Sequence, residues 1–434
     1  MLDNKKIAAF IAAKRKAKGF TQQQVADALH ISFQAVSKWE SGASYPAVEL
    51  LYALARLLGT TTDEILNAQD ADDAGLTYGK AGVDIASTDA IKRGMAAQLR
   101  SENPRVLNGL GAFASLYDIR FDELVHPVLV LKSEEPGSKQ KLALQYGYTE
   151  SICHDMVNHL VNDIIVMGAK PLAVLDTIIC GHAEKDTVQT IIKGIAQACR
   201  ANECDLVGGE TSVQPGVLEK GVYVLTASIA GIADRDSILD GTKIRAGDTL
   251  LALASNGLHT NGYSLARRLM DILPQIQNER VGGESFLEAL MKPHTPYYPM
   301  VKGLLGNHAL HGMAHITGGG IAGNLVRILP QGCAARVDLG SLRIPQIFRH
   351  IRANGNIADA EMLQTFNCGA GLILAVEAHT AQAISRQLSA FCECYPIGEV
   401  VAGESAVIFE KKALRYFKWV RRNPAQQLRG KSLR

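Results

Sequence analysis

The sequence predicts a multidomain protein in which a small all-α head precedes a larger mixed α/β body. A length of 434 residues is too great for one compact core and suggests two or three domains. The first 66 residues repeat apolar positions with the period of an α-helix, in short blocks separated by capping residues. Beyond residue 75, apolar segments of strand length, such as PVLVL and DTLLALAS, alternate with helical segments. That alternation is typical of an α/β chain.

The charge is unevenly distributed along the chain. The net charge is only +2, but residues 411–434 contain nine Lys or Arg and no Asp or Glu, so the remainder holds 36 basic against 43 acidic residues. A basic end on an acidic chain indicates either a contact with a polyanion or a solvated tail. The hydrophobic share of 47% is that of an ordinary globular protein, which argues against general disorder.

The cysteines and the apolar segments bear on the compartment. None of the eight cysteines forms a CxxC pair, which predicts that the cysteines are free thiols in a reducing compartment and do not form a disulfide framework or a metal site. The apolar run IAAFIAA near the N-terminus is short for a signal peptide, and no segment approaches the ~18 apolar residues of a membrane span. We therefore expect a cytoplasmic protein with no membrane partner.

Residues 1–69 are predicted to form a domain of five short helices. Thr21 and Gln24 form a capping-box pattern, Ser32 precedes the helical segment FQAVSKWE, and five leucines between residues 50 and 58 form an apolar stripe. Two short helices joined by a turn, the second of them polar, suit the major groove of DNA. The stretch TQQQVADALHISFQAVSKWESG resembles the lambda-repressor/Cro-like helix-turn-helix family; the alternative is an unrelated helical bundle.

This resemblance implies that the head binds double-stranded DNA. Glutamine can pair with adenine and lysine with guanine or phosphate, and the glutamine that opens the second helix matches a phosphate contact of the family. Val36 and Trp39 are expected in the core, whereas Lys14, Arg15, Lys16 and Lys18 are expected to attract phosphate. The expected DNA-binding residues are Gln22, Ser32, Gln34, Ser37 and Lys38.

Three glycine clusters indicate a phosphorylated ligand in the body. They are LVGGET at 206–211, SNGLHTNGYSLARR at 255–268 and HITGGGIAGN at 315–324. Glycine lets backbone N–H groups approach an anion closely, especially before a helix. One such cluster is weak support, because glycine turns are common, but three with adjacent polar residues are typical of a phosphate-binding protein.

The order of the body's segments resembles that of AIR synthase, the phosphoribosylformylglycinamidine cyclo-ligase of purine biosynthesis. The segments are AGVDI (81–85), GLGAF (109–113), VND (161–163), the three glycine clusters and TFNCGAG (365–371). The resemblance implies an N-terminal domain at 76–240, whose strands pair across a homodimer, and an α/β C-terminal domain at 241–410. Residues 70–75 are then a linker and 411–434 a tail.

The implied reaction is an ATP-driven ring closure with Mg²⁺, in which the substrate's amide oxygen is phosphorylated and its own amine then displaces phosphate. The residues that match the family's nucleotide positions are Asp84, Glu134, Lys139, Asp163, Glu210 and Thr211, with Asp84 and Asp163 as Mg²⁺ ligands. Those that match its substrate positions are His259, Asn261, His315, Thr317, Gly318, Gly319 and Gly320. Asp163, His259 and Lys139 are the expected catalytic residues.

The chain also departs from the family pattern. Its nucleotide loop is SEEPGSK at 133–139 where the family has TDGVGTK, and Pro136 removes an N–H that could meet phosphate. Thr295 stands where the family's PTRxY segment has arginine. Three hypotheses therefore remain open: a cyclo-ligase with a regulatory head, a transcription regulator that senses a purine intermediate or nucleotide, and an ATP-dependent enzyme for another substrate.

Overall fold

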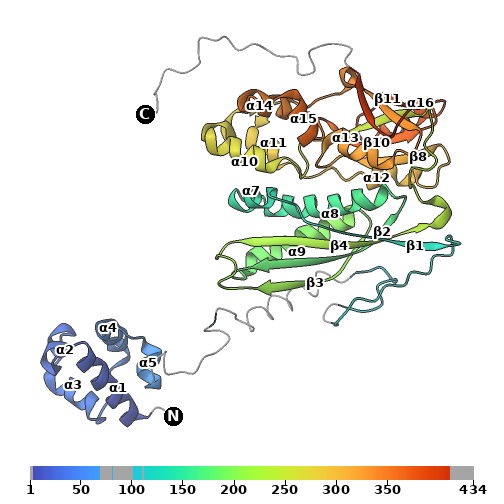
Figure 1. Cartoon of the computed structure of the whole chain (residues 1–434). Helices are drawn as coiled ribbons and strands as arrows, with labels where there is room; N and C mark the ends of the chain where they lie inside the picture. Colours follow the sequence, from blue (N-terminus) through green and yellow to red (C-terminus); the bar gives the residue numbers. More distant parts are fainter. Residues whose placement is uncertain (1–2, 69–80, 82–100, 110–111, 411–434) are drawn as a thin grey trace, which may run out of the picture. The chain divides into compact units, whose positions relative to one another are not determined.

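The structure is a computed structural model that describes residues 3–68, 81, 101–109 and 112–410. The chain divides into two compact units, residues 1–82 and 83–434, which are described separately (Figure 1). Asp84, the expected linker at 70–75 and the basic tail lie outside the described residues. All eight cysteines are free, as expected, and seven of them are buried. Among the described helices, none is long and apolar enough to cross a bilayer.

The head contains the five helices that the sequence predicts. Its elements are α1 (Asn4–Ala17), α2 (Gln22–Ala28), α3 (Phe33–Glu40), α4 (Val48–Leu58) and α5 (Thr62–Asn67). The capping box of Thr21 and Gln24 is formed, and Ser32 caps α3. Val36 and Trp39 are buried in the core, as expected, together with Ile11 and Leu54. The turn at residues 29–32 separates α2 from α3, which is a helix-turn-helix.

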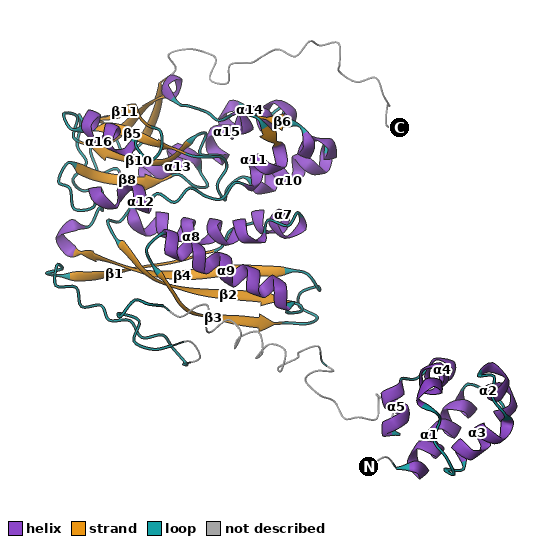
Figure 2. Ribbon diagram, turned by 180° about the vertical axis from the view of Figure 1, so that it is seen from behind, coloured by secondary structure: helices purple, strands orange, loops and turns teal. Residues whose placement is uncertain are grey.

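The first half of the body is a four-stranded sheet with helices on one face (Figure 2). The strand order is β1 (Pro127–Glu134), β4 (Tyr223–Asp234), β2 (Lys170–Cys180), β3 (Asp205–Val213). Only β2 and β3 are parallel, and α9 (Lys185–Ala201) connects them. The helix α8 (Thr149–Ile165), which follows α7 (Lys139–Gln145), contacts β1, β2 and β4.

The second half is a six-stranded sheet, also with helices packed around it. Its strand order is β12 (Val407–Glu410), β9 (Cys333–Asp338), β11 (Cys394–Ala402), β5 (Thr249–Ala254), β10 (Ala370–Val376), β8 (Leu310–His315). The strands β5, β8 and β10 are buried along most or all of their length, as expected where both faces are covered. The helices are α10 (Tyr263–Ile272), α11 (Phe286–Met291), α12 (Tyr298–Val301), α13 (Gly320–Leu325), α14 (Gln346–Gly355), α15 (Asp359–Thr365) and α16 (Ala381–Leu388).

Helix α8 lies between the two halves, with the four-stranded sheet on one side and the second half on the other (Figure 1). Twelve of its 17 residues are buried, which is what a helix covered on both sides requires. A single hydrophobic core runs from α7 and α8 through both sheets to β11. The buried positions of α8 include polar residues, and these build the candidate site.

Candidate functional site

A stripe of polar side chains along α8 joins the two halves of the body. Asp155, Asn158, His159 and Asn162 are buried at spacings of three and four residues, so they share one face of the helix. Asn158 Nδ2 donates to the carbonyl of His294 at 2.6 Å, and Asn162 Nδ2 donates to that of Thr295 at 2.9 Å. Sequence reasoning missed this stripe, although polar residues at helical spacing in an apolar helix were a visible signal.

The same stripe fixes the segment at 292–297. The backbone N–H of His294 donates to Asp155 Oδ1 at 2.8 Å, and that of Tyr297 donates to Asn162 Oδ1 at 3.1 Å. Paired donors and acceptors satisfy backbone groups that are buried without a strand or helix of their own. The side chains of His294 and Thr295 are thereby held at a defined place in the interior.

Lys139 is fully buried, and its ammonium is paired with Asp155 in the interior. Its ammonium is 2.7 Å from Asp155 Oδ2 and donates to the carbonyls of His259 at 3.2 Å and Lys292 at 2.6 Å. An ammonium has three N–H donors, and these contacts use all of them. In this structure the three N–H donors of Lys139 are directed at protein oxygens, so the expected nucleotide contact and catalytic role of Lys139 stay predictions. It holds α7 against α8 and the second half.

Asp163, at the end of α8, is surrounded by basic groups. Its Oδ1 accepts from His315 Nδ1 at 2.7 Å, and its Oδ2 lies 3.1 Å from Lys132 Nζ and 3.8 Å from His159 Nε2. Lys132 Nζ is also 2.9 Å from Glu134 Oε2. Burial raises the pKa of Asp163, but the hydrogen bond and charges of His315, His159 and Lys132 outweigh it and leave the pKa well below the usual range.

This arrangement does not by itself form a magnesium site. Mg²⁺ requires several oxygen ligands in octahedral geometry. Both oxygens of Asp163 face nitrogen donors, and Glu134 is paired with Lys132. Asp84, the second expected ligand, lies outside the described residues.

Glu210 and Thr211 do not join Asp163 within one chain. Both lie on β3, whereas Lys132 and Glu134 lie on β1 at the opposite edge of the sheet. Three interstrand spacings separate these edges, or about 14 Å. The expected nucleotide residues are thus divided between two places, and Glu210 and Thr211 remain candidates at the second of them.

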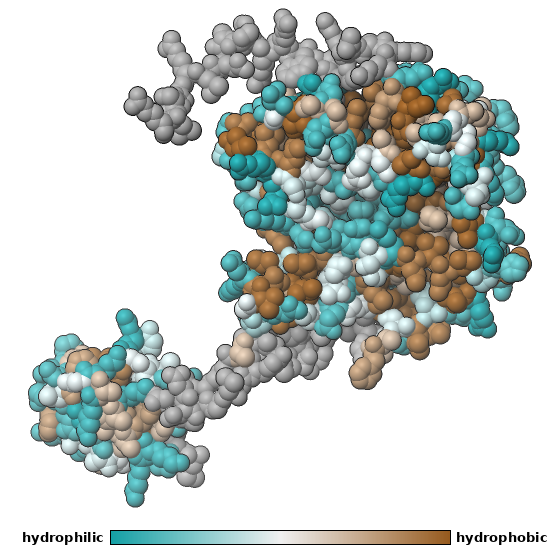
Figure 3. Space-filling view, viewed as in Figure 1, coloured by the Kyte–Doolittle hydropathy of each residue, from teal (hydrophilic) through white to brown (hydrophobic). Residues whose placement is uncertain are grey.

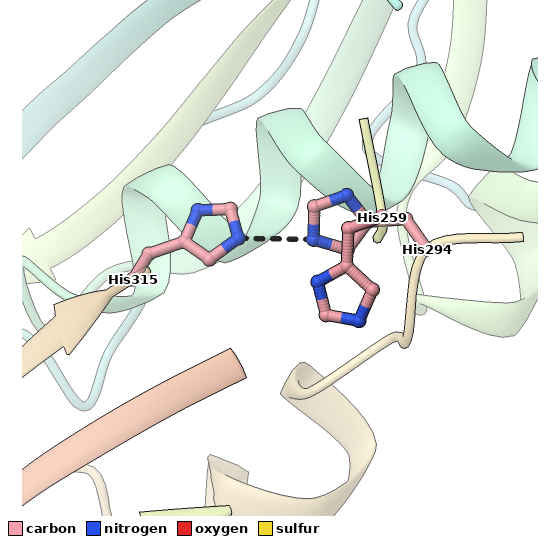
Figure 4. Close-up of side chains that lie close together, drawn as sticks. All are labelled: His259, His294 and His315. Atoms are coloured by element: carbon pink, nitrogen blue, oxygen red, sulfur yellow. Dashed lines mark hydrogen bonds between the residues drawn. The ribbon is translucent and has the colours of Figure 1, made fainter. Parts of the chain in front are cut away.

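Four histidines meet at the end of the α8 stripe. His294 Nε2 is 2.9 Å from His315 Nε2, and the rings of His259 and His294 stack with centroids 4.0 Å apart (Figure 4). His159 lies beside them, 5.3 Å from His315 between ring centroids. Burial is the largest cause that lowers the pKa of His259 and of His294, and it helps lower that of His159 to about 4. These three rings are neutral at pH 7.

Two of the predicted glycine clusters come together next to this group. A side-chain carbon at Gly318 would lie 3.1 Å from Asn261 Oδ1, so the turn at Thr317–Gly320 borders the segment at 255–262. Asn324 Nδ2 donates to the carbonyls of Thr317, Gly318 and Gly320 and fixes the shape of the turn. A hollow of about 360 Å³, lined by Ser138, Thr260, Asn261 and the start of α10, opens beside it.

The backbone at these turns is strained in the way that ligand-binding loops often are. His259 has a φ of 61°, which is rare for a residue with a side chain, and Gly319 and Gly320 have φ values of 95° and 62°. A side chain at Gly320 would lie 1.9 Å from the carbonyl oxygen of Leu363, so only glycine fits there. The residues that match the family's substrate positions therefore lie close together: His259, Asn261, His315 and the turn at 317–320. Lys139 contacts this group through the carbonyl of His259.

In the head, the residues expected to contact DNA fall into two groups. Ser32, Gln34 and Lys38 are exposed and Ser37 is half-buried on or before α3. Gln22 Nε2 donates to Glu40 Oε2 at 2.8 Å, and Glu40 also accepts two hydrogen bonds from Arg15, at 2.6 and 2.9 Å. The expectation that Arg15 attracts phosphate is wrong, because its guanidinium is buried against Glu40 and the carbonyl of Phe20.

Comparison with known proteins agrees with the division of the chain into a helix-turn-helix head and a body of two halves. Residues 127–233 match the family described as "AIR synthase related protein, N-terminal domain", residues 245–411 match its C-terminal domain, and residues 11–65 match the family described as "Helix-turn-helix". The chain is 41% identical over 329 residues to a phosphoribosylformylglycinamidine cyclo-ligase of Methylobacillus flagellatus, a span of 75% of this chain and 95% of that protein.

Solved structures resemble the body in fold. A thiamine-monophosphate kinase from Stenotrophomonas maltophilia has a TM-score of 0.54 at 19% identity and covers 76% of this chain and 96% of its own. The E. coli protein HypE has a TM-score of 0.55 at 17% identity and covers 74% of this chain and 93% of its own. At these identities the likeness concerns the fold alone.

Proposed function

The chain belongs to the AIR synthase related family, and on that basis we propose that it is an ATP-dependent phosphoribosylformylglycinamidine cyclo-ligase with a sequence-specific DNA-binding head. The observation that carries the proposal is the 41% identity over 95% of a cyclo-ligase. The geometry supports it, because Asn261 and the Thr317–Gly320 turn, which match the family's substrate positions, lie against each other.

The residues of this chain divide the work as follows. The turn at Thr317–Gly320 and the amide of Asn261 bind and orient the substrate's phosphate. The neutral ring of His259 has a lone pair that can accept the proton lost by the substrate's amine during ring closure. ATP, when bound, supplies the phosphoryl group that turns the amide oxygen into a leaving group. Glu210 and Thr211 are assigned to nucleotide binding at the β3 edge.

The enzymatic proposal is tested with the purified full chain, phosphoribosylformylglycinamidine and ATP with Mg²⁺. We expect aminoimidazole product and ADP in equal amounts, and we expect Asn261→Ala to raise KM at least tenfold. Asn354→Ala is the matched control, because Asn354 is exposed on α14 and bonds only its own helix. If wild type makes no product while nucleotide still changes its affinity for DNA, the chain is a ligand-sensing regulator instead.

The DNA-binding proposal rests on the helix-turn-helix match and on the exposed side chains of α3. After selection of a preferred DNA sequence from a random library, Gln34→Ala should weaken binding to it by about 1–3 kcal/mol. Lys16→Ala should instead weaken binding to all sequences equally and flatten the salt dependence by about one unit of slope. If neither Gln34→Ala nor Lys16→Ala changed the affinity for DNA, the head would be a protein-binding module instead.

We also propose a homodimer that forms through the open face of the four-stranded sheet. On this face Leu129, Leu131 and Leu175 are 49%, 71% and 46% exposed, around a hollow of about 490 Å³ (Figure 3 shows hydrophobic side chains over this part of the body). Exposed leucines in alternate strand positions mark an interface. A two-fold dimer would also present two heads to paired half-sites. Sedimentation should show a dimer at micromolar concentration, and Leu131→Glu should make it a monomer.

A further inference from the structure

We propose that His259, His294 and His315 together bind a divalent transition-metal ion of the Zn²⁺ class, beyond the proposed cyclo-ligase activity. The three side chains are 1%, 0% and 5% exposed, and one nitrogen from each lies within 4.8 Å of the other two. They come from the loop after β5, the segment held by α8 and the end of β8, so only the fold brings them together (Figure 4).

Buried nitrogen atoms without partners point to a ligand at this place. Among the described residues, no hydrogen-bond partner reaches Nδ1 of His259 or Nδ1 of His294. A buried polar atom that makes no hydrogen bond costs about 1–3 kcal/mol, so two such atoms in adjacent rings need an explanation. For His259 a metal ion provides one, because it would use the Nδ1 lone pair that no described donor satisfies. His294 would bind the ion through Nε2, the atom that now faces His315.

Two of the rings are already oriented as metal ligands usually are. His315 Nδ1 faces Asp163 at 2.7 Å, which directs the lone pair of Nε2 inward, and His259 Nε2 faces the hydroxyl of Thr295 at 3.2 Å, which does the same for Nδ1. Such outer partners are typical of zinc-binding histidines. An imidazole binds a metal ion through the lone pair of one ring nitrogen, so each of the three rings can supply one ligand atom.

An ion can enter if the contact between His294 and His315 opens and the stacked rings of His259 and His294 turn toward it. Zinc at 2.0–2.1 Å from each nitrogen, in tetrahedral geometry, separates its ligands by about 3.3–3.4 Å. His294 Nε2 and His315 Nε2 are now 2.9 Å apart, so this contact must open by a fraction of an ångström. Three imidazoles select Zn²⁺, Co²⁺, Ni²⁺ or Cu²⁺ over Mg²⁺, which prefers oxygen.

The local sequence removes what would oppose a cation here. In the resemblance given above, Pro293–Tyr297 corresponds to the PTRxY segment, so His294 and Thr295 correspond to its threonine and arginine. A guanidinium at position 295 would repel a metal ion held by His259, whereas the threonine hydroxyl orients that ring. The two changes together exchange a fixed positive charge for a nitrogen ligand.

The test is a titration of the metal-free full chain with Co²⁺, in the presence of millimolar Mg²⁺. We expect one Co²⁺ per chain, with the intense visible absorption of a four-coordinate site, and displacement by one equivalent of Zn²⁺. His294→Thr should lower the affinity at least 100-fold, and Asp163→Asn should lower it about 10- to 100-fold through His315. His308→Thr, which changes an exposed histidine, should bind like wild type.

Several results would overturn the proposal. These are wild-type titration without visible absorption, equal affinity in wild type and His294→Thr, or an equal loss in His308→Thr. If His294→Thr does not fold, wild-type chain loaded with Co²⁺ decides the matter by NMR, where three shifted imidazole N–H signals are expected and none would refute the site. Because the readout is binding, it is independent of cyclo-ligase turnover. Since the metal and the proposed proton transfer use the same ring of His259, Zn²⁺ should also inhibit the proposed reaction.

Discussion

Two of the buried aspartates of the body, Asp155 on α8 and Asp176 on β2, have different surroundings. Asp155, fully buried on α8, faces the ammonium of Lys139 and accepts from the backbone of His294. Asp176, 7% exposed on β2, makes no ion pair with any described residue. Burial raises the pKa of both, to about 6 for Asp155, where Lys139 opposes the rise, and to about 7 for Asp176, where Glu210 adds to it.

The two aspartates differ in their effect on stability: Asp155 links segments of the chain, whereas ionised Asp176 has no counter-charge. Asp155 is ionised at pH 7 and holds α7, α8 and the 292–297 segment together, because each of its contacts comes from a different part of the chain. Asp176 is close to its titration midpoint at pH 7, and its side chain fills space that Gly209 leaves open, since a carbon there would lie 2.2 Å from Asp176 Oδ1. A carboxyl that is buried without a counter-charge does not stabilise the fold when it is ionised.

The largest expected effect is that of Asp155→Ala. Removing one partner leaves the Lys139 ammonium buried without a counter-charge, and such losses cost about 3–5 kcal/mol. Denaturant unfolding at pH 7, followed by far-UV circular dichroism, should show this decrease in the free energy of unfolding of the body.

The double variant Lys139→Met/Asp155→Leu is the control for this prediction. Exchange of a whole buried pair for apolar residues of similar volume is often close to neutral. The double variant should therefore recover part of the stability, because the ammonium is no longer left unpaired, while the backbone groups of His259, Lys292 and His294 still lose their partners. A loss below about 1 kcal/mol in Asp155→Ala would mean that the pair contributes little and that the comparison with Asp176 fails.

Asp176→Asn should act in the opposite direction and depend on pH. The pKa of Asp176 is raised from 3.8 to about 7 in the folded chain. Its contribution to stability is complete below about pH 4 and is lost as the pH rises through 7. Wild type should thus lose about 2–3 kcal/mol between pH 5 and pH 8 from this group, at 1.36 kcal/mol per pKa unit, and the asparagine variant should not.

Thermal unfolding of both chains across pH 4–8 measures this difference. The stability gap should widen up to pH 7 and then level off. Asp122→Asn, at an exposed position, is the control and should leave the pH profile unchanged. A gap that narrows as the pH rises would show that Asp176 is paired in solution after all.

The head and the elements of the body could be predicted from sequence because their signals are local. The capping box at Thr21 and Gln24, the turn before Ser32 and the apolar period all act within a few residues. The strands β1 and β5 coincide with the apolar runs PVLVL and DTLLALAS that predicted them, within one to three residues. The order of glycine clusters likewise identified the family.

The site itself could be predicted only in part, because its contacts join distant segments. Asp163 and His315 are 152 residues apart, and Lys139 reaches carbonyls 120 and 153 residues away. The motif suggested a lysine that meets phosphate, but nothing local indicates that a lysine at the start of α7 points inward. His294 was overlooked since a lone histidine carries no pattern until α8 fixes its backbone. Arg15 was misassigned for the same reason, since Glu40 lies 25 residues away.

The smallest expected effect is that of His294→Gln on the metal-free chain. His294 shares a feature with each aspartate. Its backbone N–H is hydrogen-bonded to Asp155, whereas its buried Nδ1, like the carboxyl of Asp176, is not compensated by a partner among the described residues. Glutamine can keep a hydrogen bond to His315 and removes the unsatisfied ring nitrogen, so the gain offsets the packing lost. The free energy of unfolding should change by less than about 1 kcal/mol. In Zn²⁺-containing buffer the two chains should differ more, because only wild type gains stability from a bound ion. Denaturant unfolding with and without Zn²⁺ measures both values, and a loss of several kcal/mol without metal would assign His294 to the framework.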